Sequence, residues 1–321
     1  MPWHDHGVPN PRLAAAFRYG FFPLVFFGAI TVGWLLMQHG VSPMIATGAV
    51  VFPCALLIGL SERVQPRFAS WAQSHGDWPA DLTHTFLSTL LPPEIIRAVT
   101  IGALTGAAVW LAERTGRSWW PGDGSMLVQL PLAMVVSEFG SYWAHRLMHE
   151  KEWLWRVHAV HHSAPRLYWL NAGRFHPLDT AIQYVGQTVP LIVLGASGEV
   201  IALFSLWTAV HGMFQHANLD IRLGPLNWIF SMAELHRWHH SLVLEEANTN
   251  YGANICFWDI VFRTRYLPDR EPPEQIGIAD LPRFPAGYFA HLASPFRWRA
   301  LVEEAGATPM AEAVGADSTA R

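Results

Sequence analysis

Residues 145–240 contain four histidine motifs: HRLMH (145–149), HAVHH (158–162), HGMFQH (211–216) and HRWHH (236–240). Eleven of the 17 histidines of the chain lie within this stretch. Histidines three or four residues apart lie on the same side of a helix, so we expect each HxxHH motif to direct its three imidazoles to one place. Neutral imidazole is the commonest metal ligand in proteins. Two such motifs and two further pairs offer more ligands than one tetrahedral site can use, so they predict a centre for two metal ions.

Nine of these histidines are predicted metal ligands. Adjacent imidazoles, with a third one helical turn away, would repel one another if charged and would lack hydrogen-bond partners if buried. A metal ion resolves both problems because it binds the lone pairs of neutral rings. The predicted ligands are His145, His149, His158, His161, His162, His216, His236, His239 and His240.

Two further candidate ligands, His211 and His176, each have a competing interpretation. His211 lies five residues before His216, about 140° away around a regular helix, so the two share a face only if the helix end is distorted. His176 precedes Pro177 and can cap the following helix instead of binding a metal. The six histidines outside residues 145–240 are interpreted as structural.

Polar residues near the motifs are candidates for orienting the imidazoles. The second nitrogen of a metal-bound histidine usually donates to an acceptor that fixes the ring. Glu138 lies seven residues before His145, two turns away on the same helical face, and a carboxylate inside an apolar helix suggests a role. A polar contact between two helices is the alternative interpretation of this glutamate. The further predicted partners are Asn218, Asn250, Asp259 and Asp179.

The composition is that of a membrane protein. Of the 321 residues, 51% are hydrophobic and 14% are charged, against about 25% charged in typical soluble domains. The chain also has 18 Phe and 16 Trp, residues that gather at membrane interfaces. With a net charge of −4 and no basic tract, we predict no nucleic-acid partner. The two cysteines, Cys54 and Cys256, are far apart and argue against a disulfide framework or a thiolate metal site.

Apolar segments close to the roughly 20 residues that cross a bilayer predict four membrane spans. These segments are residues 21–37, 43–60, 94–111 and 126–142. Arginines precede the first span and follow the second, whereas the loop between them has none, so both ends of this pair are predicted to lie in the cytoplasm. The polar segment 68–89 is expected at the membrane interface, with Pro92 and Pro93 starting the third span. The first twenty residues do not have the pattern of a cleavable signal peptide.

Two more apolar segments, 177–194 and 199–214, form either a fifth and a sixth span or a shallow re-entrant hairpin. In both cases the chain returns to the side it left, so all histidine motifs can face the cytoplasm. The predicted fold is an all-α, multi-span transmembrane helical bundle with a histidine-rich cap on its cytoplasmic side. Because arginine replaces lysine almost everywhere and alanine and glycine abound, we expect a bacterial inner-membrane protein with a cytoplasmic N-terminus.

The order HxxxH, HxxHH, a further histidine and HxxHH resembles the fatty acid hydroxylase/sterol desaturase superfamily of histidine-rich integral-membrane di-iron oxygenases. The resemblance covers residues 131–265 and includes NYG (250–252) and Trp258-Asp259. One departure is Arg263, where relatives more often have glycine. The resemblance implies a fatty acid hydroxylase-like catalytic domain at 126–270, after an N-terminal membrane region at 1–125 with three spans and an interfacial segment. A partly disordered C-terminal tail is expected at 271–321.

The resemblance also implies the chemistry. It indicates a monooxygenase of lipid metabolism or biosynthesis that binds two Fe ions, with zinc as a substitute in purified protein. The substrate would be a lipid, a fatty-acyl chain or a sterol-like molecule, hydroxylated or desaturated at an unactivated C–H with O₂. Electrons would come from an external reductase, ferredoxin or cytochrome, since the sequence has no dinucleotide-binding fingerprint and no haem-attachment motif.

Two alternative functions stay open at this point. A membrane zinc-dependent hydrolase would need a general-base carboxylate beside its ligands, as in HExxH, and this spacing is absent from the sequence. Glu234, two residues before His236, is the nearest substitute. A metal transporter or metal-binding membrane protein would place its ligands inside the spans near the middle of the membrane, whereas these motifs lie at the ends of predicted spans.

Overall fold

The computed structural model describes residues 11–306, which form helices and no β-strand. The prediction of an all-α fold is therefore confirmed for this part of the chain. The α-helices are α1 (Pro11–Gln38), α2 (Pro43–Val64), α3 (Trp78–Thr83), α4 (Leu91–Thr115), α5 (Met126–Glu150), α6 (Glu152–His162), α7 (Pro177–Leu194), α8 (Gly198–His216), α9 (Ala233–His239), α10 (Leu244–Ala247), α11 (Phe257–Val261), α12 (Tyr288–Ala293) and α13 (Trp298–Ala305).

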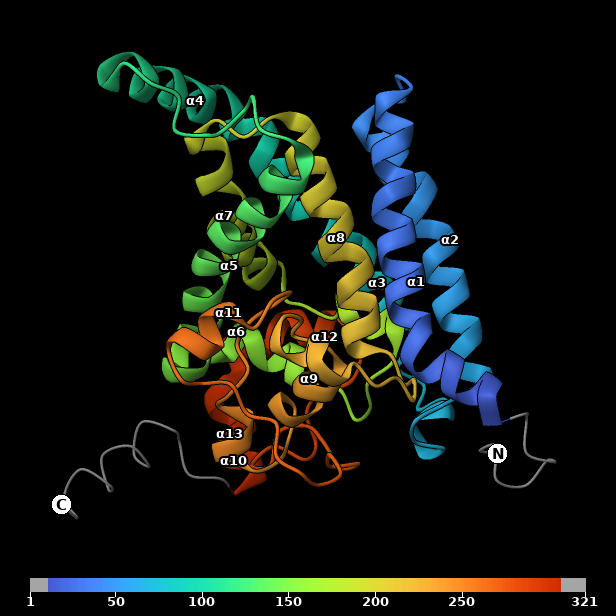
Figure 1. The fold of residues 1–321 in the computed structure, drawn as a ribbon. Helices are drawn as coiled ribbons and strands as arrows, with labels where there is room; N and C mark the ends of the chain where they lie inside the picture. The colour runs from blue at the N-terminus through green and yellow to red at the C-terminus, as the bar shows by residue number, and fades with distance from the viewer. Residues whose placement is uncertain (1–10, 307–321) are drawn as a thin grey trace.

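The long helices and the short helices occupy different parts of the molecule. Helices α1 and α2 lie side by side, α8 packs against both, and α5 packs against α7 and α8. The short helices α6 and α9 to α13 gather at the lower end of the bundle, as Figure 1 shows. The histidine motifs of α5, α6, α8 and α9 meet at this end. A largely apolar bundle thus carries a polar cap, as predicted.

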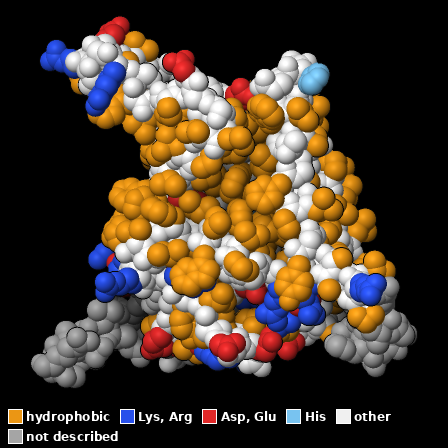
Figure 2. Space-filling model, in the orientation of Figure 1, with side chains coloured by type: hydrophobic (Ala, Val, Ile, Leu, Met, Phe, Trp, Pro, Cys, Tyr) orange, Lys and Arg blue, Asp and Glu red, His pale blue; other side chains and the backbone are white. Residues whose placement is uncertain are grey.

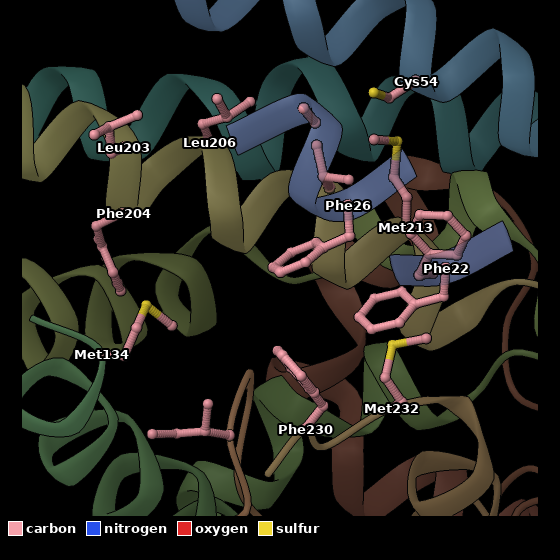
Figure 3. Close-up of a cluster of buried hydrophobic side chains, with 14 of the residues drawn as sticks. Phe22, Phe26, Cys54, Met134, Leu203, Phe204, Leu206, Met213, Phe230 and Met232 are labelled. Atoms are coloured by element: carbon pink, nitrogen blue, oxygen red, sulfur yellow. The ribbon is translucent and has the colours of Figure 1, made fainter. Parts of the chain in front are cut away.

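The main hydrophobic core lies between α1, α2, α5 and α8. It includes Phe22 and Phe26 of α1, Met134 of α5, and Leu203 and Phe204 of α8, all less than 3% exposed (Figure 3). Burying a side chain of this size contributes about 1.5–3 kcal/mol in a water-soluble protein. Within a membrane the driving force is instead close packing, which such interlocking side chains provide. The core fixes α8 against α1 and thereby the position of the histidines that follow.

Three helical stretches are long and apolar enough to cross a membrane: Pro11–Gln38, Pro43–Val64 and Trp78–Thr115. They contain the first three predicted spans. Helices α5, α7 and α8 occupy the positions of the fourth predicted span and of the hairpin, but they are not among the three, and their crossing stays a prediction. Figure 2 shows hydrophobic side chains over the middle of the molecule and most charged side chains at its lower end.

The third stretch begins earlier than the sequence predicted. Helix α3, a π-helix at His84–Leu90 and α4 form one continuous run. Pro92 and Pro93 lie in the first turn of α4, but the continuous helical run begins before them, although proline lacks the N–H that a helix interior uses. The helix passes from π to α geometry just before them, and π-helical turns often accompany functional positions. Asp81 and His84, within the expected interfacial segment, are fully buried against the cap.

The C-terminal segment is partly folded. Trp298, Leu301 and Val302 of α13 are buried against Ala159 of α6 and against Leu281. Residues 271–306 are thus attached to the helix that carries HAVHH. The last fifteen residues, for which disorder is predicted, lie outside the described range, as do His4 and His6. The division into three regions at 125 and 270 remains a prediction.

Helices α5 and α7 are in close backbone contact at Gly140 and Gly186. A Cβ atom built on Gly140 would lie 2.1 Å from the carbonyl oxygen of Gly186, a distance that real side chains do not reach. We expect Gly140→Ala to force the helices apart and to lower the free energy of unfolding by about 1–3 kcal/mol or more. The melting temperature of the detergent-purified protein measures this. The control is Gly28→Ala on α1, because a Cβ atom built on Gly28 has no other atom within 4 Å. Equal melting temperatures of the two variants would contradict the close contact of α5 and α7.

Candidate metal centre

The structure brings all nine predicted ligands together in two buried groups. The first group contains His145, His149, His158, His162 and His239, and the second contains His161, His216, His236 and His240. Within each group the ligand nitrogens all lie within 4.8 Å of one another. The groups are adjacent, because the rings of His162 and His240 stack with their centroids 4.4 Å apart. Each group can hold a metal ion.

Each HxxHH motif divides between the two groups. In HAVHH, His158 and His162 belong to the first group and His161 to the second. HRWHH divides in the opposite way, with only His239 in the first group. The expectation that a motif directs three imidazoles to one place is therefore wrong. Residues four apart differ by about 40° around a helix, whereas neighbouring residues differ by about 100°. The first and last histidines of each motif, four residues apart, therefore stay in one group, and the middle histidine points to the other group.

The hydrogen bonds of the first group show which nitrogens are free to bind a metal. Nδ1–H of His145 donates to the carbonyl oxygen of Tyr251 (2.8 Å), and Nδ1–H of His158 donates to Oδ2 of Asp179 (2.7 Å). A neutral imidazole carries one proton, so Nε2 of each ring presents only a lone pair. These two Nε2 atoms face each other at 3.0 Å. Two lone pairs repel at this distance unless a cation binds both, so the residues fit a metal ion.

The second group has the same arrangement. Nδ1–H of His216 and of His161 donates to an oxygen atom, which leaves the Nε2 lone pairs free. Nε2 of His216 lies 3.0 Å from Nε2 of His236, and Nε2 of His161 lies 3.2 Å from Nε2 of His240. Two nitrogens bound at about 2.1 Å to one ion and about 90° apart are separated by about 3.0 Å. The observed spacing fits two ligands of one ion.

Oxygen acceptors fix the orientation of six of the nine rings. The pairs are His145 with the carbonyl of Tyr251, His149 with Oδ1 of Asn248, His158 with Asp179, His161 with the carbonyl of Arg174, His216 with Oδ1 of Asn171, and His239 with the carbonyl of Thr249. Such partners set the tautomer and make the ring a better ligand. In the described part of the chain, Nε2 of His149, His162 and His239 has no hydrogen-bond partner.

Burial keeps these imidazoles in the neutral form that binds metals. Burial lowers the pKa of six histidines well below 6.5, and repulsion from neighbouring imidazoles lowers it further. These are His149, His161, His162, His236, His239 and His240. A metal therefore does not have to displace a proton from these rings at neutral pH.

Comparison with known proteins agrees with this geometry. The sequence model of the fatty acid hydroxylase family matches residues 130–264. An ornithine lipid hydroxylase of Rhizobium tropici is 36% identical over 304 residues, which are 94% of this chain and 90% of that protein. The chain belongs to the fatty acid hydroxylase family. The resemblance drawn from the motifs is thus confirmed, and with it the enzyme class, an O₂-dependent oxidoreductase.

More distant members of the fatty acid hydroxylase family match a smaller share of the chain. An alkylglycerol monooxygenase of Xenopus tropicalis is 27% identical over 159 residues, 48% of this chain and 31% of that protein. Methylsterol monooxygenase 1 of Rattus norvegicus is 31% identical over 134 residues, 40% of this chain and 44% of that protein. No solved structure gives a significant match.

The departure from the fatty acid hydroxylase pattern at Arg263 has a structural consequence. Arg263 has a φ of 59°, in the left-handed region that glycine adopts without strain. The residue lies in the turn after α11, where the N–H of Thr264 donates to the carbonyl of Asp259 (2.8 Å). The turn therefore keeps the conformation that suits glycine, and no histidine of either group is involved.

The predicted partners Glu138 and Asp259 support the centre of this family member through a loop. Glu138 accepts hydrogen bonds from the backbone N–H groups of residues 253–254 (2.9 and 3.0 Å). Asp259 accepts from the backbone N–H groups of residues 251–252 (2.8 Å each). The same loop provides the carbonyl that binds His145. Both carboxylates thus position a loop and do not contact an imidazole, and the Glu138 contact is not one between two helices.

The other two predicted partners are farther from the histidines. Asn218 bonds both backbone groups of Phe68 (2.9 Å each). Asn250, with a φ of 53°, accepts from the N–H of Tyr266 (2.7 Å) and donates to the carbonyl of Leu235 (3.0 Å). Among the hydrogen bonds of residues 11–306, none joins Asn218 or Asn250 to an imidazole. Asp179 is the one carboxylate considered from the sequence that does contact a ligand.

The candidates His211 and His176 lie outside both groups. His211 is fully buried among the aromatic rings of α1 and Phe230. His176 caps α7, where its Nδ1 accepts a hydrogen bond from the backbone N–H of Leu178 (3.2 Å). The capping interpretation of His176 therefore fits the structure, and neither residue is close enough to join a metal site.

Proposed function

We propose that this chain is a membrane-bound di-iron monooxygenase that hydroxylates an unactivated C–H of a lipid. The observation that carries the proposal is the pair of adjacent buried imidazole groups, whose lone pairs converge at one end of an apolar helical bundle. Nitrogen-rich ligation suits iron, with zinc and copper as competitors. Five ligands in one group exceed the four that structural zinc sites use, which favours iron.

Two iron ions bound there would supply the reductive activation of O₂ and the oxidising power that an unactivated C–H requires. The chain holds the ligands and excludes water. The ring of Phe175 stacks on His161 with centroids 4.2 Å apart, and Trp155 covers His149 and His162 at 5.2 and 5.3 Å. Because the two groups share helices α6 and α9, each helps to fix the position of the other.

A lipid substrate is supported by the names of the relatives and by the apolar bundle. The relatives act on ornithine lipid, alkylglycerol and methylsterol, and all are named hydroxylases or monooxygenases, which favours hydroxylation over desaturation. The head of the lipid would stay near the cap and its chain would enter between the helices. Electrons would come from an external reductase, ferredoxin or cytochrome. We place the cap and the N-terminus on the cytoplasmic side of a bacterial inner membrane.

The two alternative functions lack support from the site. A zinc hydrolase would need a carboxylate directed at the ligands, but Glu234 accepts from the N–H of Leu223 (2.7 Å) and from Nδ2 of Asn227 (2.8 Å). A transporter would bind its metal in the middle of the helices, whereas α6 and α9, which carry histidines of both groups, lie at the lower end of the bundle (Figure 1). Family membership also favours the oxygenase.

Metal analysis and comparative lipidomics test the proposed function. We expect the purified protein to contain about two iron ions per chain, and cells that overproduce it to accumulate a lipid with one added oxygen atom. Formation of this lipid should require O₂ and a reductant. Overproduced protein can bind zinc in place of iron, so the dependence on O₂ is the more decisive result. A product that lacks two hydrogens would indicate desaturation, and one zinc per chain with no need for O₂ would reject the oxygenase.

A further inference from the structure

Three side chains of α8 have buried polar atoms without hydrogen-bond partners in the described part of the chain. Nε1 of Trp207, Oγ1 of Thr208 and both ring nitrogens of His211 have no partner in the described part of the chain. The side chain of His211 is 0% exposed. A buried polar group without a partner costs free energy, and native proteins contain few of them. Three such groups within about one helical turn indicate a partner that is not part of the chain.

These side chains share one face of α8 and meet an aromatic wall. His211 lies about 40° from Trp207 and about 60° from Thr208 around the helix. The ring of Trp207 contacts Phe26 and Phe230, with centroids 4.7 and 5.8 Å apart, and His211 stacks on Phe230 at 6.1 Å. Figure 3 shows Phe26 and Phe230 directed toward the same region of the core. These rings offer no oxygen or nitrogen acceptor, so the wall cannot satisfy the polar groups.

The polar groups are close to the metal centre along the helix. His211 precedes His216 of the second histidine group by five residues, which is about 7.5 Å along the helix axis. A lipid with one polar group at His211 could therefore present a nearby carbon to the centre. This distance between His211 and His216 along the helix axis is much shorter than the length of an extended acyl chain.

We propose that Trp207, Thr208 and His211 form a polar subsite that hydrogen-bonds a neutral carbonyl oxygen of the lipid substrate, in an amide or ester group. The indole N–H only donates, and the hydroxyl and one nitrogen of the neutral imidazole can also donate, so each of the three side chains can donate to an acceptor. A charged group is disfavoured in these apolar surroundings. The subsite determines which carbon of the lipid lies at the metal centre. This inference rests on the proposed lipid hydroxylase function and names the substrate class.

Lipid binding to the purified full-length protein tests the subsite without turnover. The probes are N-methylmyristamide and a hydrocarbon of equal length, and native mass spectrometry measures their dissociation constants. We expect the wild type to prefer the amide, and Thr208→Val and Trp207→Phe each to weaken amide binding about fivefold to tenfold. Hydrocarbon binding should not change. The control is Ser205→Ala on the same helix, whose hydroxyl already donates to the carbonyl of Ile201 (2.9 Å).

The melting temperature without probe separates a binding role from a structural one. Because the hydroxyl of Thr208 has no partner among residues 11–306, Thr208→Val should melt at the same temperature as the wild type or higher. A lower melting temperature with an unchanged preference for the amide would show that the hydroxyl serves the fold, and would overturn the proposal. Equal binding of both probes to the wild type would also overturn it. Amide binding that depends on Thr208 in a protein that hydroxylates no lipid would support the subsite and reject the proposed function.

Discussion

Replacing His239 by alanine will leave about one metal ion per chain where the wild type binds about two, and will reduce lipid hydroxylation more than a hundredfold. His239 belongs to the first group, and its Nε2 has no partner in the described chain. Its Nδ1–H donates to the carbonyl of Thr249 (2.7 Å), which fixes the ring. Alanine therefore removes a ligand and one hydrogen bond. His161→Ala should have the same effect through the second group. Metal content by mass spectrometry and product formation measure both variants.

Two histidines outside the groups provide matched controls. His176→Ala removes the cap of α7 and a hydrogen bond to the backbone of Leu292. It should cost about 1 kcal/mol of stability or somewhat more, with both metals retained. His39 is an exposed residue whose ring bonds the carbonyl of Leu35. His39→Ala should change neither the stability nor the metal content. Circular dichroism and gel filtration verify that each variant is folded. If His239→Ala kept two metals and near-normal turnover, His239 would have to be removed from the ligand set.

The ligands could be predicted from the sequence because helical spacing alone decides much of their arrangement. His145 and His149 lie four residues apart on one helix, and so do His158 and His162, so each pair shares a face whatever the rest of the fold does. The same rule separates His211 from His216, and the structure places only His216 in a group. The division of each HxxHH motif between two groups follows from the 100° between neighbouring residues. Only the structure shows it, because it brings the histidine rings of α6 close to those of α9.

Apart from Asp179, the acceptors could not be predicted, because no spacing relates them to the ligands. Asn171 is 45 residues from His216 and Asn248 is 99 residues from His149, and both lie outside the long helices. Three other acceptors are backbone carbonyls, which have no sequence signature. Glu138 is suggested by its position in an apolar helix, yet its partners belong to a loop more than a hundred residues away. Loop geometry, not local pattern, decides these contacts.

The third membrane stretch shows a similar limit. Pro92 and Pro93 normally indicate a helix start, and the sequence predicts one here. The helix instead runs through them after a π-helical segment. Tertiary contacts stabilise this segment: Nδ1–H of His84 donates to the carbonyl of Phe175 (2.9 Å), and its Nε2 lies 2.9 Å from Nδ1 of His291. Long-range contacts of this kind allow a helical run to begin before a local start signal.

Asp179→Asn will weaken metal binding about tenfold to a hundredfold while the fold stays intact. Asp179 is 0% exposed, and its Oδ2 accepts from Nδ1–H of His158 (2.7 Å). Its Oδ1 has no hydrogen-bond partner in the described chain. A buried carboxylate with so few partners is costly unless a positive charge lies nearby. A metal ion on Nε2 of His158 provides that charge, and the carboxylate in turn makes the ring a stronger ligand.

The sign of the effect on stability separates this role of Asp179 from a purely structural one. Asparagine keeps an oxygen acceptor for His158 but removes the buried charge, so the metal-free variant should melt at the wild-type temperature or higher. Metal binding stabilises a folded protein in proportion to the logarithm of its affinity, and a tenfold to hundredfold loss removes about 1.4–2.7 kcal/mol of that gain. The difference in melting temperature between metal-loaded and chelator-treated protein should therefore shrink. A metal-free variant that melts well below the wild type would instead assign Asp179 to the fold.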